Sequence, residues 1–451
     1  WLRLSRAFQL PAPWLRELPG AMRELPALRG PLCRNAASVA GGLRREAEIQ
    51  LLHRLKGAQT AAAVLEVAHR NLEVLNAIHA ATALHRIAAL RGSGGRGADA
   101  DSGGSGAGEG GEEGAAALEA ACLRGLLRVQ RGLLADGPVQ SRTLANTAWA
   151  VATLSVRDPP LMHAIAAPSS AQLEQFTPQD LSMTSWAFSR LLFRDEPLLD
   201  ALAAESISNI AEFAPGYLAN TAWSFAALRL RHGPLRDAMS SAALPPIGHF
   251  RPQELSATAW SVAALLVEDL PLMDAVASAS MARIDEASTQ SLANTAWSLA
   301  VRAFQHQPLL EAMSSAAIRR CPAFRPRELA NTAWAVAKLS YHDAPLFDAL
   351  SSAARPRLHQ YTNQDLANLA WACARLGVAD RPLLKAIASA SINLLAAPGG
   401  ASGGQDLANM AWAFASFAFA HRPLLDAIAA ASMRRMDDFL AQHLAMMAWS
   451  C

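Results

Sequence analysis

The stretch Leu329-Ala-Asn-Thr-Ala-Trp-Ala-Val-Ala-Lys-Leu339 carries a motif that recurs along the chain. Its tryptophan is one of nine that stand at positions 149, 186, 223, 260, 297, 334, 371, 412 and 449. Seven of the eight intervals are 37 residues long, and the remaining interval of 41 residues contains the Gly-rich run 398–404. A fixed period of this size is typical of proteins built from stacked structural repeats.

Each repeat unit reads as two short helices separated by a proline. With the tryptophan as position zero, Leu stands at −5 in all nine copies and Pro-Leu at +11 and +12 in the eight complete ones. The segment Thr177-Pro-Gln-Asp180 combines an N-cap threonine, a proline at the first helical position and an acid at the third, which indicates a helix start. Proline disrupts a helix interior, so position +11 ends the first helix and opens the second, with Asp at +9 as the expected N-cap. The sequence therefore predicts an all-α solenoid of about ten two-helix repeats.

A helical wheel divides the first helix of the unit into three zones. Leucine, threonine and aliphatic residues lie at −5, −2, +2 and +5, and mostly alanine lies at −4, −1 and +3. We expect the tryptophan to fill the core beside the alanines rather than to stack on bases, because a residue present in every copy cannot discriminate between ligands. The positions left over, −7, −3, +1, +4 and +8, form a narrow polar stripe.

This stripe supplies the candidate binding residues. Position −3 is Asn in six copies: Asn146, Asn220, Asn294, Asn331, Asn368 and Asn409. These amides could bind a base or a phosphate, or they could bond to the backbone of the adjacent repeat. Cationic side chains on the stripe could neutralise phosphates, or they could form an ordinary solvated face. They are Arg142 and Arg327 at −7, Arg190, Lys338 and Arg375 at +4, and Arg157, Arg194 and Arg231 at +8.

Composition argues against several other classes of function. The net charge of +2 is lower than that of a strongly basic nucleic-acid binder. The five cysteines are scattered without a CxxC pair, so we expect neither a disulfide framework nor a metal site. No cluster of nucleophile, base and acid stands apart from the repeat, and we expect no catalytic activity and no cofactor. No apolar run reaches the ~18 residues of a membrane helix, so membrane insertion is not expected.

The segments outside the regular repeats suggest four regions. Residues 1–42 are Pro- and Arg-rich and form either an organelle-targeting leader or a basic arm. Residues 43–91 contain leading helices and the first half of a degenerate repeat, in which His85 takes the place of the tryptophan. Residues 92–114 are a Gly-rich insert, and 115–451 form the solenoid, whose last repeat is incomplete.

The motif Leu-Ala-Asn-Thr-Ala-Trp-Ala-x-Ala-x-Leu, the Pro-Leu-Leu that follows it and the 37-residue period resemble the octotricopeptide and heptatricopeptide repeat proteins, including those that end in a RAP domain. The resemblance implies an α-solenoid that binds organellar mRNA or rRNA, either as a transcript maturation, stability or translation factor or within an organellar ribosome. It also implies that each repeat addresses about one nucleotide through polar residues of its first helix, here −7, −3 and +4. No stretch of the 451 residues resembles a RAP domain. We expect an organelle, the mitochondrion rather than the chloroplast.

A second hypothesis is a protein–protein scaffold of the armadillo or HEAT type that binds no nucleic acid. The near-neutral charge favours it, as do acids at position +14 such as Asp200, Asp237, Asp274 and Asp348. Under the RNA-binding hypothesis, neighbouring proteins of a ribonucleoprotein are expected as partners besides the RNA.

Overall fold

The computed structural model describes residues 32–94, 109–266, 268–397, 402–417, 419 and 421–450. Most of the predicted basic extension, residues 1–31, lies outside the described residues, as do 95–108 of the predicted insert. Within the described ranges every regular element is an α-helix or a 3₁₀-helix (η), and the chain divides into two compact units, Trp1–Ser208 and Asn209–Cys451.

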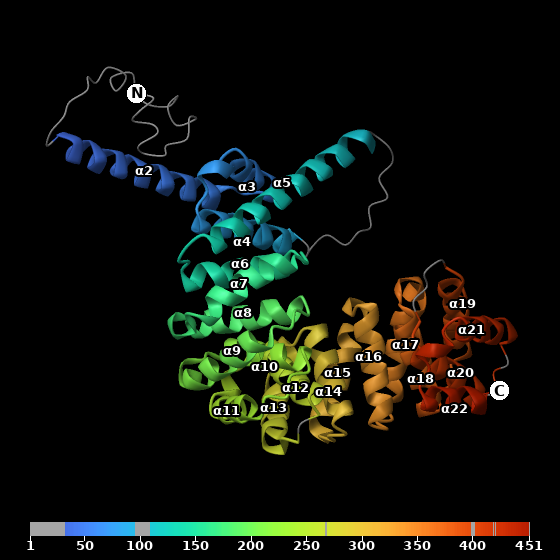
Figure 1. Ribbon diagram of the computed structural model, residues 1–451. Coiled ribbons are helices and arrows are strands. Elements are labelled where there is room, and N and C mark those ends of the chain that lie inside the picture. Colours follow the sequence, from blue (N-terminus) through green and yellow to red (C-terminus); the bar gives the residue numbers. More distant parts are fainter. Residues whose placement is uncertain are drawn as a thin grey trace. The chain divides into compact units, whose positions relative to one another are not determined.

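The first unit contains the leading helices and the first two complete repeats (Figure 1). Its elements are α2 (Leu32–Gly57), α3 (Ala61–His69), η3 (Leu72–Val74), α4 (Ala77–Gly94), α5 (Glu109–Ala135), α6 (Ser141–Thr153), α7 (Pro159–Ser170), η4 (Leu173–Gln175), α8 (Pro178–Arg190) and α9 (Glu196–Ser208). Helices α4 and α5 extend into the ends of the Gly-rich stretch, at residues 92–94 and 109–114.

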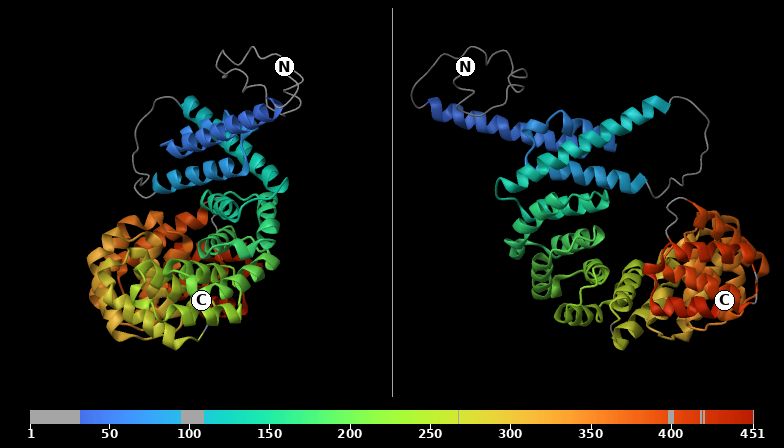
Figure 2. Two further views of the ribbon diagram at one scale, coloured as in Figure 1. Left: turned by 90° about the vertical axis from the view of Figure 1, so that its left-hand side faces the viewer. Right: turned by 45° about the vertical axis from the view of Figure 1, so that its right-hand side comes forward.

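The second unit contains the remaining repeats, most of which consist of a first helix, a second helix and a short 3₁₀ turn (Figure 2). Its elements are η5 (Ile210–Glu212), α10 (Pro215–Ala227), α11 (Gly233–Ala243), η6 (Ile247–His249), α12 (Pro252–Ala264), α13 (Leu270–Ala282), η7 (Ile284–Glu286), α14 (Thr289–Val301), α15 (Gln307–Arg320), η8 (Cys321–Ala323), α16 (Pro326–Lys338), α17 (Ala344–Ala354), η9 (Arg355–Gln360), α18 (Asn363–Leu376), α19 (Arg381–Ala396), α20 (Gly404–Ser416), α21 (Arg422–Met433), η10 (Met436–Asp438) and α22 (Ala441–Ser450).

Within each unit, the first helices of consecutive repeats pack directly on one another. In the first unit α4 packs on α6 and α6 on α8, and in the second unit the row runs from α10 through α12, α14, α16, α18 and α20 to α22. The predicted all-α solenoid is therefore confirmed. The alanines at −4 and −1 explain the close approach, since Ala330 and Ala333 of α16 are completely buried.

Side-chain caps fix the start of both helices in the unit. Thr177 forms the predicted capping box with Asp180 at the start of α8. Asp158 and Asp343 at position +9 accept a hydrogen bond from the backbone N–H three residues later, as predicted. Where histidine replaces aspartate at +9, as in His306, its Nδ1 accepts the same bond. Two residue types thus satisfy one geometric requirement of the second helix.

The first helix ends in a left-handed turn at position +6. Gly377 has φ 69°, whereas the equivalent Ala303 and Ser340 have φ 50° and 53°. In the Gly377 turn the N–H of Val378 donates to the carbonyl of Cys373, which is the 6→1 bond of a Schellman motif. Most copies therefore hold an L-residue in a conformation that glycine adopts without steric cost.

Gly377→Ala is expected to lower the free energy of unfolding by about 1 kcal/mol, and the reciprocal Ala303→Gly to raise it by a similar amount. A Cβ at Gly377 would meet nothing within 4 Å, so the change isolates the backbone conformation. Equilibrium urea unfolding of both variants measures the effect. If both variants unfold with the same free energy as the wild type, the turn stores no strain.

Two recurring polar bonds lock consecutive elements together. At position +23, Arg283 donates through Nη1 to the carbonyl of Phe250 at 3.0 Å, and Arg357 donates to that of Phe324 at 3.0 Å. At +17, Ser314 donates to Oδ2 of Asp343, the N-cap of the next second helix, at 2.5 Å. These arginines serve the scaffold and are not available for a ligand.

None of the described helices combines the length and apolarity that a lipid bilayer requires.

Candidate functional site

The accessible face of the first helices consists of positions −7, −3, zero and +4. In α16 these are Arg327, Asn331, Trp334 and Lys338, of which the two cations are exposed and the other two are half-buried. Residues three or four positions apart lie on the same helix face, so the asparagine and the +4 residue flank the indole. We call these four positions, taken over all repeats, the Asn–Trp stripe.

The prediction that the tryptophans fill the core was wrong, because none of the nine is fully buried. The eight from Trp149 to Trp412 are half-buried, and Trp449 is 63% exposed. The indoles contact one another along the stripe: Trp260 lies 5.9 Å from Trp223 and 6.1 Å from Trp297 between ring centroids. A second run, Trp334, Trp371, Trp412 and Trp449, has spacings of 6.2 to 6.4 Å. The indoles thus pack against each other while their remaining surface joins the stripe.

Two positions of the predicted polar stripe do not belong to it. Position +1 is buried in all eight complete copies, and the serines there, such as Ser298, donate to the carbonyl four residues earlier. Position +8 lies beyond the end of the first helix, which stops at or near +4, so a wheel cannot place it. Arg157, Arg194 and Arg231 therefore lie on the turns between the two helices of a repeat.

The asparagines at −3 have unpaired side-chain amides. Among the described residues, no hydrogen bond connects the amide of Asn146, Asn220, Asn294, Asn331, Asn368 or Asn409 to another group of the protein. The alternative that they form a structural ladder of bonds between repeats is therefore wrong. Each amide offers two donors and one acceptor to a ligand.

The candidate cations differ in whether the protein already engages them. Within the described ranges Arg157, Arg190, Arg231, Arg327 and Lys338 are exposed and form no ion pair. The others make contacts: Arg142 with Asp180 at 3.2 Å, Arg194 with Glu196 at 3.9 Å, and Arg375 with the Ser340 hydroxyl at 3.4 Å. The candidate cations without an ion pair therefore lie both on the helix face and on the turns.

His85 occupies the tryptophan position of the degenerate repeat, as predicted. Its ring lies 4.6 Å from that of Trp149, so the residue at this position of the degenerate repeat contacts the tryptophan of the next repeat. Burial, with a smaller contribution from Arg86, lowers the pKa of His85 below its ordinary value. The imidazole is thus held in its neutral form.

The depressed pKa of His85 predicts a loss of stability in acid. As the pH falls below the unfolded-state pKa of about 6.5, the unfolded chain binds the proton more readily, until the pH reaches the folded pKa. His85→Phe keeps the ring contact and removes the proton site. Between pH 7 and pH 5 the unfolding free energy of the wild type should fall more steeply than that of the variant, by up to about 1.4 kcal/mol per pH unit. Urea unfolding at several pH values measures this, and parallel profiles would contradict it.

Other reactive groups do not assemble into a site. No group of three or more potential metal ligands occurs in the described part of the chain. Burial raises the pKa of the Cys321 thiol to about 11 and that of Cys373 to about 12, which keeps both protonated and unreactive at neutral pH. The Asn–Trp stripe is therefore the surface on which polar groups recur in register.

Comparison with known proteins gives one family. The model of the RNA-editing substrate-binding complex 6 protein matches residues 126–381. This segment is more than half of the chain and runs from the second half of α5 to the first residue of α19. No curated protein matches the chain.

Proposed function

Since the chain belongs to the RNA-editing substrate-binding complex 6 protein family, an RNA-associated group, we propose that its Asn–Trp stripe binds single-stranded RNA. The observation that carries this proposal is the set of unpaired asparagine amides, which recur at one position of the repeat without an intramolecular partner. A polar group that the fold does not use, repeated in register, is suited to a ligand that is itself a repeating polymer.

The stripe divides the recognition between three kinds of group. Asparagine amides can form paired hydrogen bonds with base edges, whereas Arg and Lys side chains neutralise phosphates. Within each of the two runs of tryptophans the indoles already contact their neighbours, so a base does not intercalate between them, and these rings contribute their accessible surface to the stripe. The ring spacing of 5.9 to 6.4 Å is nearly twice the ~3.4 Å rise of a stacked strand, so an RNA in register with the repeats is extended and unstacked.

The cellular role that we propose rests on the resemblance to the octotricopeptide and heptatricopeptide repeat proteins. We place the protein in an organelle, the mitochondrion rather than the chloroplast, as a non-catalytic factor for transcript maturation, stability or translation, or as a ribosome component that holds rRNA. The family description names a complex, which supports a role alongside partner proteins.

Binding of the full chain to a single-stranded RNA, measured at several salt concentrations, tests the proposal. If all eight candidate cations contact phosphates, the slope of log K against log salt is about −5.6, at about −0.7 per contact for a single strand. A measurable negative slope supports phosphate contacts. Absence of binding at low salt, or an affinity that does not change with salt, would contradict the proposal and favour the scaffold hypothesis.

A further inference from the structure

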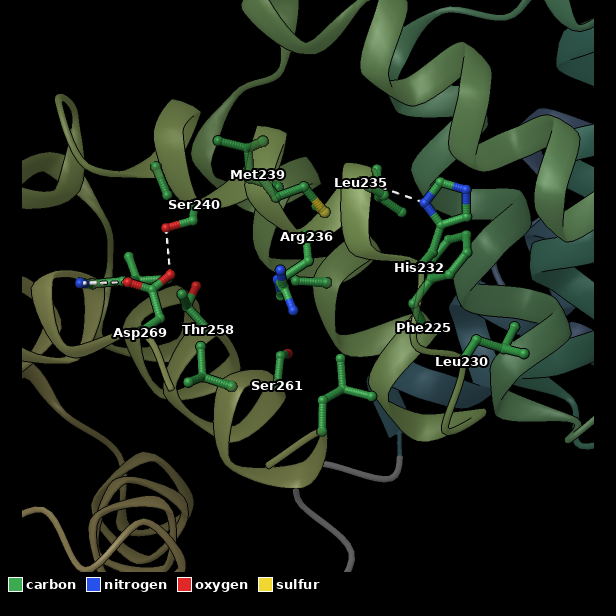
Figure 3. Close-up of a pocket in the computed structure, with 16 residues that line it drawn as sticks. Phe225, Leu230, His232, Leu235, Arg236, Met239, Ser240, Thr258, Ser261 and Asp269 are labelled. Atoms are coloured by element: carbon green, nitrogen blue, oxygen red, sulfur yellow. Dashed lines mark hydrogen bonds between the residues drawn. The ribbon is translucent and has the colours of Figure 1, made fainter. Parts of the chain in front are cut away.

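The second unit contains an apolar cavity between two second helices. It has a volume of about 60 Å³ and is lined by residues of α10, α11, α12 and the start of α13 (Figure 3). Its walls include Leu218, Phe225, Leu235, Met239 and Val262. Ser240 closes one side by donating to Oδ2 of Asp269 at 2.5 Å.

One substitution in the repeat explains the cavity. Position +13 carries a buried Leu, Met or Phe in six of the other repeats, for example Met273 and Leu310, and it is Arg236 here. The Arg236 side chain is 45% exposed, and its guanidinium is bonded to Oδ1 of Asp237 at 2.6 Å and 2.8 Å. The volume that an apolar +13 side chain would occupy is therefore left unfilled.

The equivalent place in another repeat serves as an internal comparison. Between α15 and α17 the lining residues stand at the same repeat positions, with Leu310 in place of Arg236, Met313 in place of Met239 and Val336 in place of Val262. The cavity there is about 20 Å³. With +13 apolar, the same architecture is nearly filled, so the difference lies at Arg236.

We propose that this cavity is a docking site for a partner polypeptide, which inserts one Leu, Met or Phe side chain where the protein lacks its own. The size is suitable, since about 60 Å³ holds roughly four to six water-sized spheres, comparable to the carbon atoms of one leucine side chain. The chemistry of the cavity walls also favours an apolar side chain. The wall hydroxyls of Thr258, Ser261 and Ser240 are already bonded within the protein. These three hydroxyls therefore have no proton left to donate to the acceptor atoms of a nucleobase, and burying such acceptors without partners is costly.

The charged residues at the mouth of the cavity indicate what the partner segment carries beside its apolar anchor. The mouth is lined by Arg231, Arg236, Asp237 and Glu268. Asp237 is bonded to Arg236, and Glu268 lies 3.9 Å from Arg302. Asp269 also lines the mouth, and its carboxylate accepts hydrogen bonds from the Ser240 hydroxyl and from the N–H of Leu272. Arg231 forms no ion pair within the described ranges, so it is the charged group at the mouth that has no bonded partner there. The partner segment therefore carries a carboxylate close to its apolar anchor.

Synthetic peptides with one Leu, Met or Phe between glutamates test the proposal on the full chain. One buried side chain of this kind is expected to improve affinity by roughly 10- to 100-fold over the same peptide with Ala at the anchor. Arg236→Leu fills the cavity from within and should abolish this difference. Arg381→Leu adds the same side chain on the exposed start of α19, outside the cavity, and should bind as the wild type does.

Benzene gives a second measurement that depends on the cavity alone. At saturation it should shift the methyl resonance of Met239 in the wild type and leave it unchanged in Arg236→Leu, or in Arg236→Met if the leucine variant does not fold. Equal affinity for Leu- and Ala-anchored peptides, or binding unaffected by Arg236→Leu, would overturn the proposal. A single-stranded RNA could also displace the peptide from the wild type and fail to bind Arg236→Leu. That result would assign the cavity to nucleic acid and would also overturn the proposal.

Discussion

Replacing Asn294, Asn331 and Asn368 with Ala together is expected to weaken RNA binding by about 100-fold without loss of stability. A hydrogen bond contributes roughly 1 kcal/mol, so three lost contacts amount to about 3 kcal/mol of binding free energy. The protein loses no bond of its own, because these amides have no partner within the described ranges. Alanine is also the better helix former, by up to about 0.7 kcal/mol per site.

Two measurements on the same variant separate the explanations for these asparagines. Urea unfolding should show an unchanged or increased unfolding free energy, while a fluorescence titration with single-stranded RNA shows the loss of affinity. Asn393→Ala, at an exposed position of the second helix α19, is the matched control and should alter neither. A triple variant that is destabilised by about 1 kcal/mol per site and still binds RNA as the wild type does would mean that the amides serve the fold.

The repeat architecture could be predicted because it depends on local chemistry that recurs. Pro178 and Thr177 begin a helix through backbone geometry and capping alone, and the structure has α8 begin there. His85 could be placed at a tryptophan position from spacing, and its ring indeed contacts Trp149. Such features require knowledge of a few neighbouring residues, which a sequence supplies.

The accessible surface was harder to predict because it depends on how neighbouring repeats pack. A helical wheel treats one helix by itself, so it could not show that the serine at +1, such as Ser261, is buried against the preceding repeat or that Arg157 lies beyond the helix end. It also placed the indoles beside the alanines, although the alanines bring adjacent helices so close that Trp260 is left at the edge of the interface. By contrast, Arg236 was visible in the sequence as the one arginine in an apolar column, and that signal leads to the cavity.

Reversing the charge of Arg190, Lys338 and Arg375 to Glu is expected to weaken RNA binding at ~0.1 M salt by at least about 100-fold. Each phosphate contact with a single strand contributes about 0.7 to the salt slope, which is a factor of about five in affinity between 1 M and 0.1 M salt. Three contacts then give about 100-fold, and the repulsion from the new carboxylates adds to this. The slope should become less steep by about 2.

A second triple variant separates binding on the Asn–Trp stripe from non-specific attraction by the net charge. Arg381→Glu, Lys385→Glu and Arg422→Glu change the total charge by the same amount on exposed positions of the second helices α19 and α21. Non-specific attraction would make both triple variants equally weak, with the same salt slope. Binding on the Asn–Trp stripe requires the first variant to lose affinity and slope and the second to keep both. The difference between the two slopes counts the phosphates held at position +4, independently of the affinity of any particular RNA.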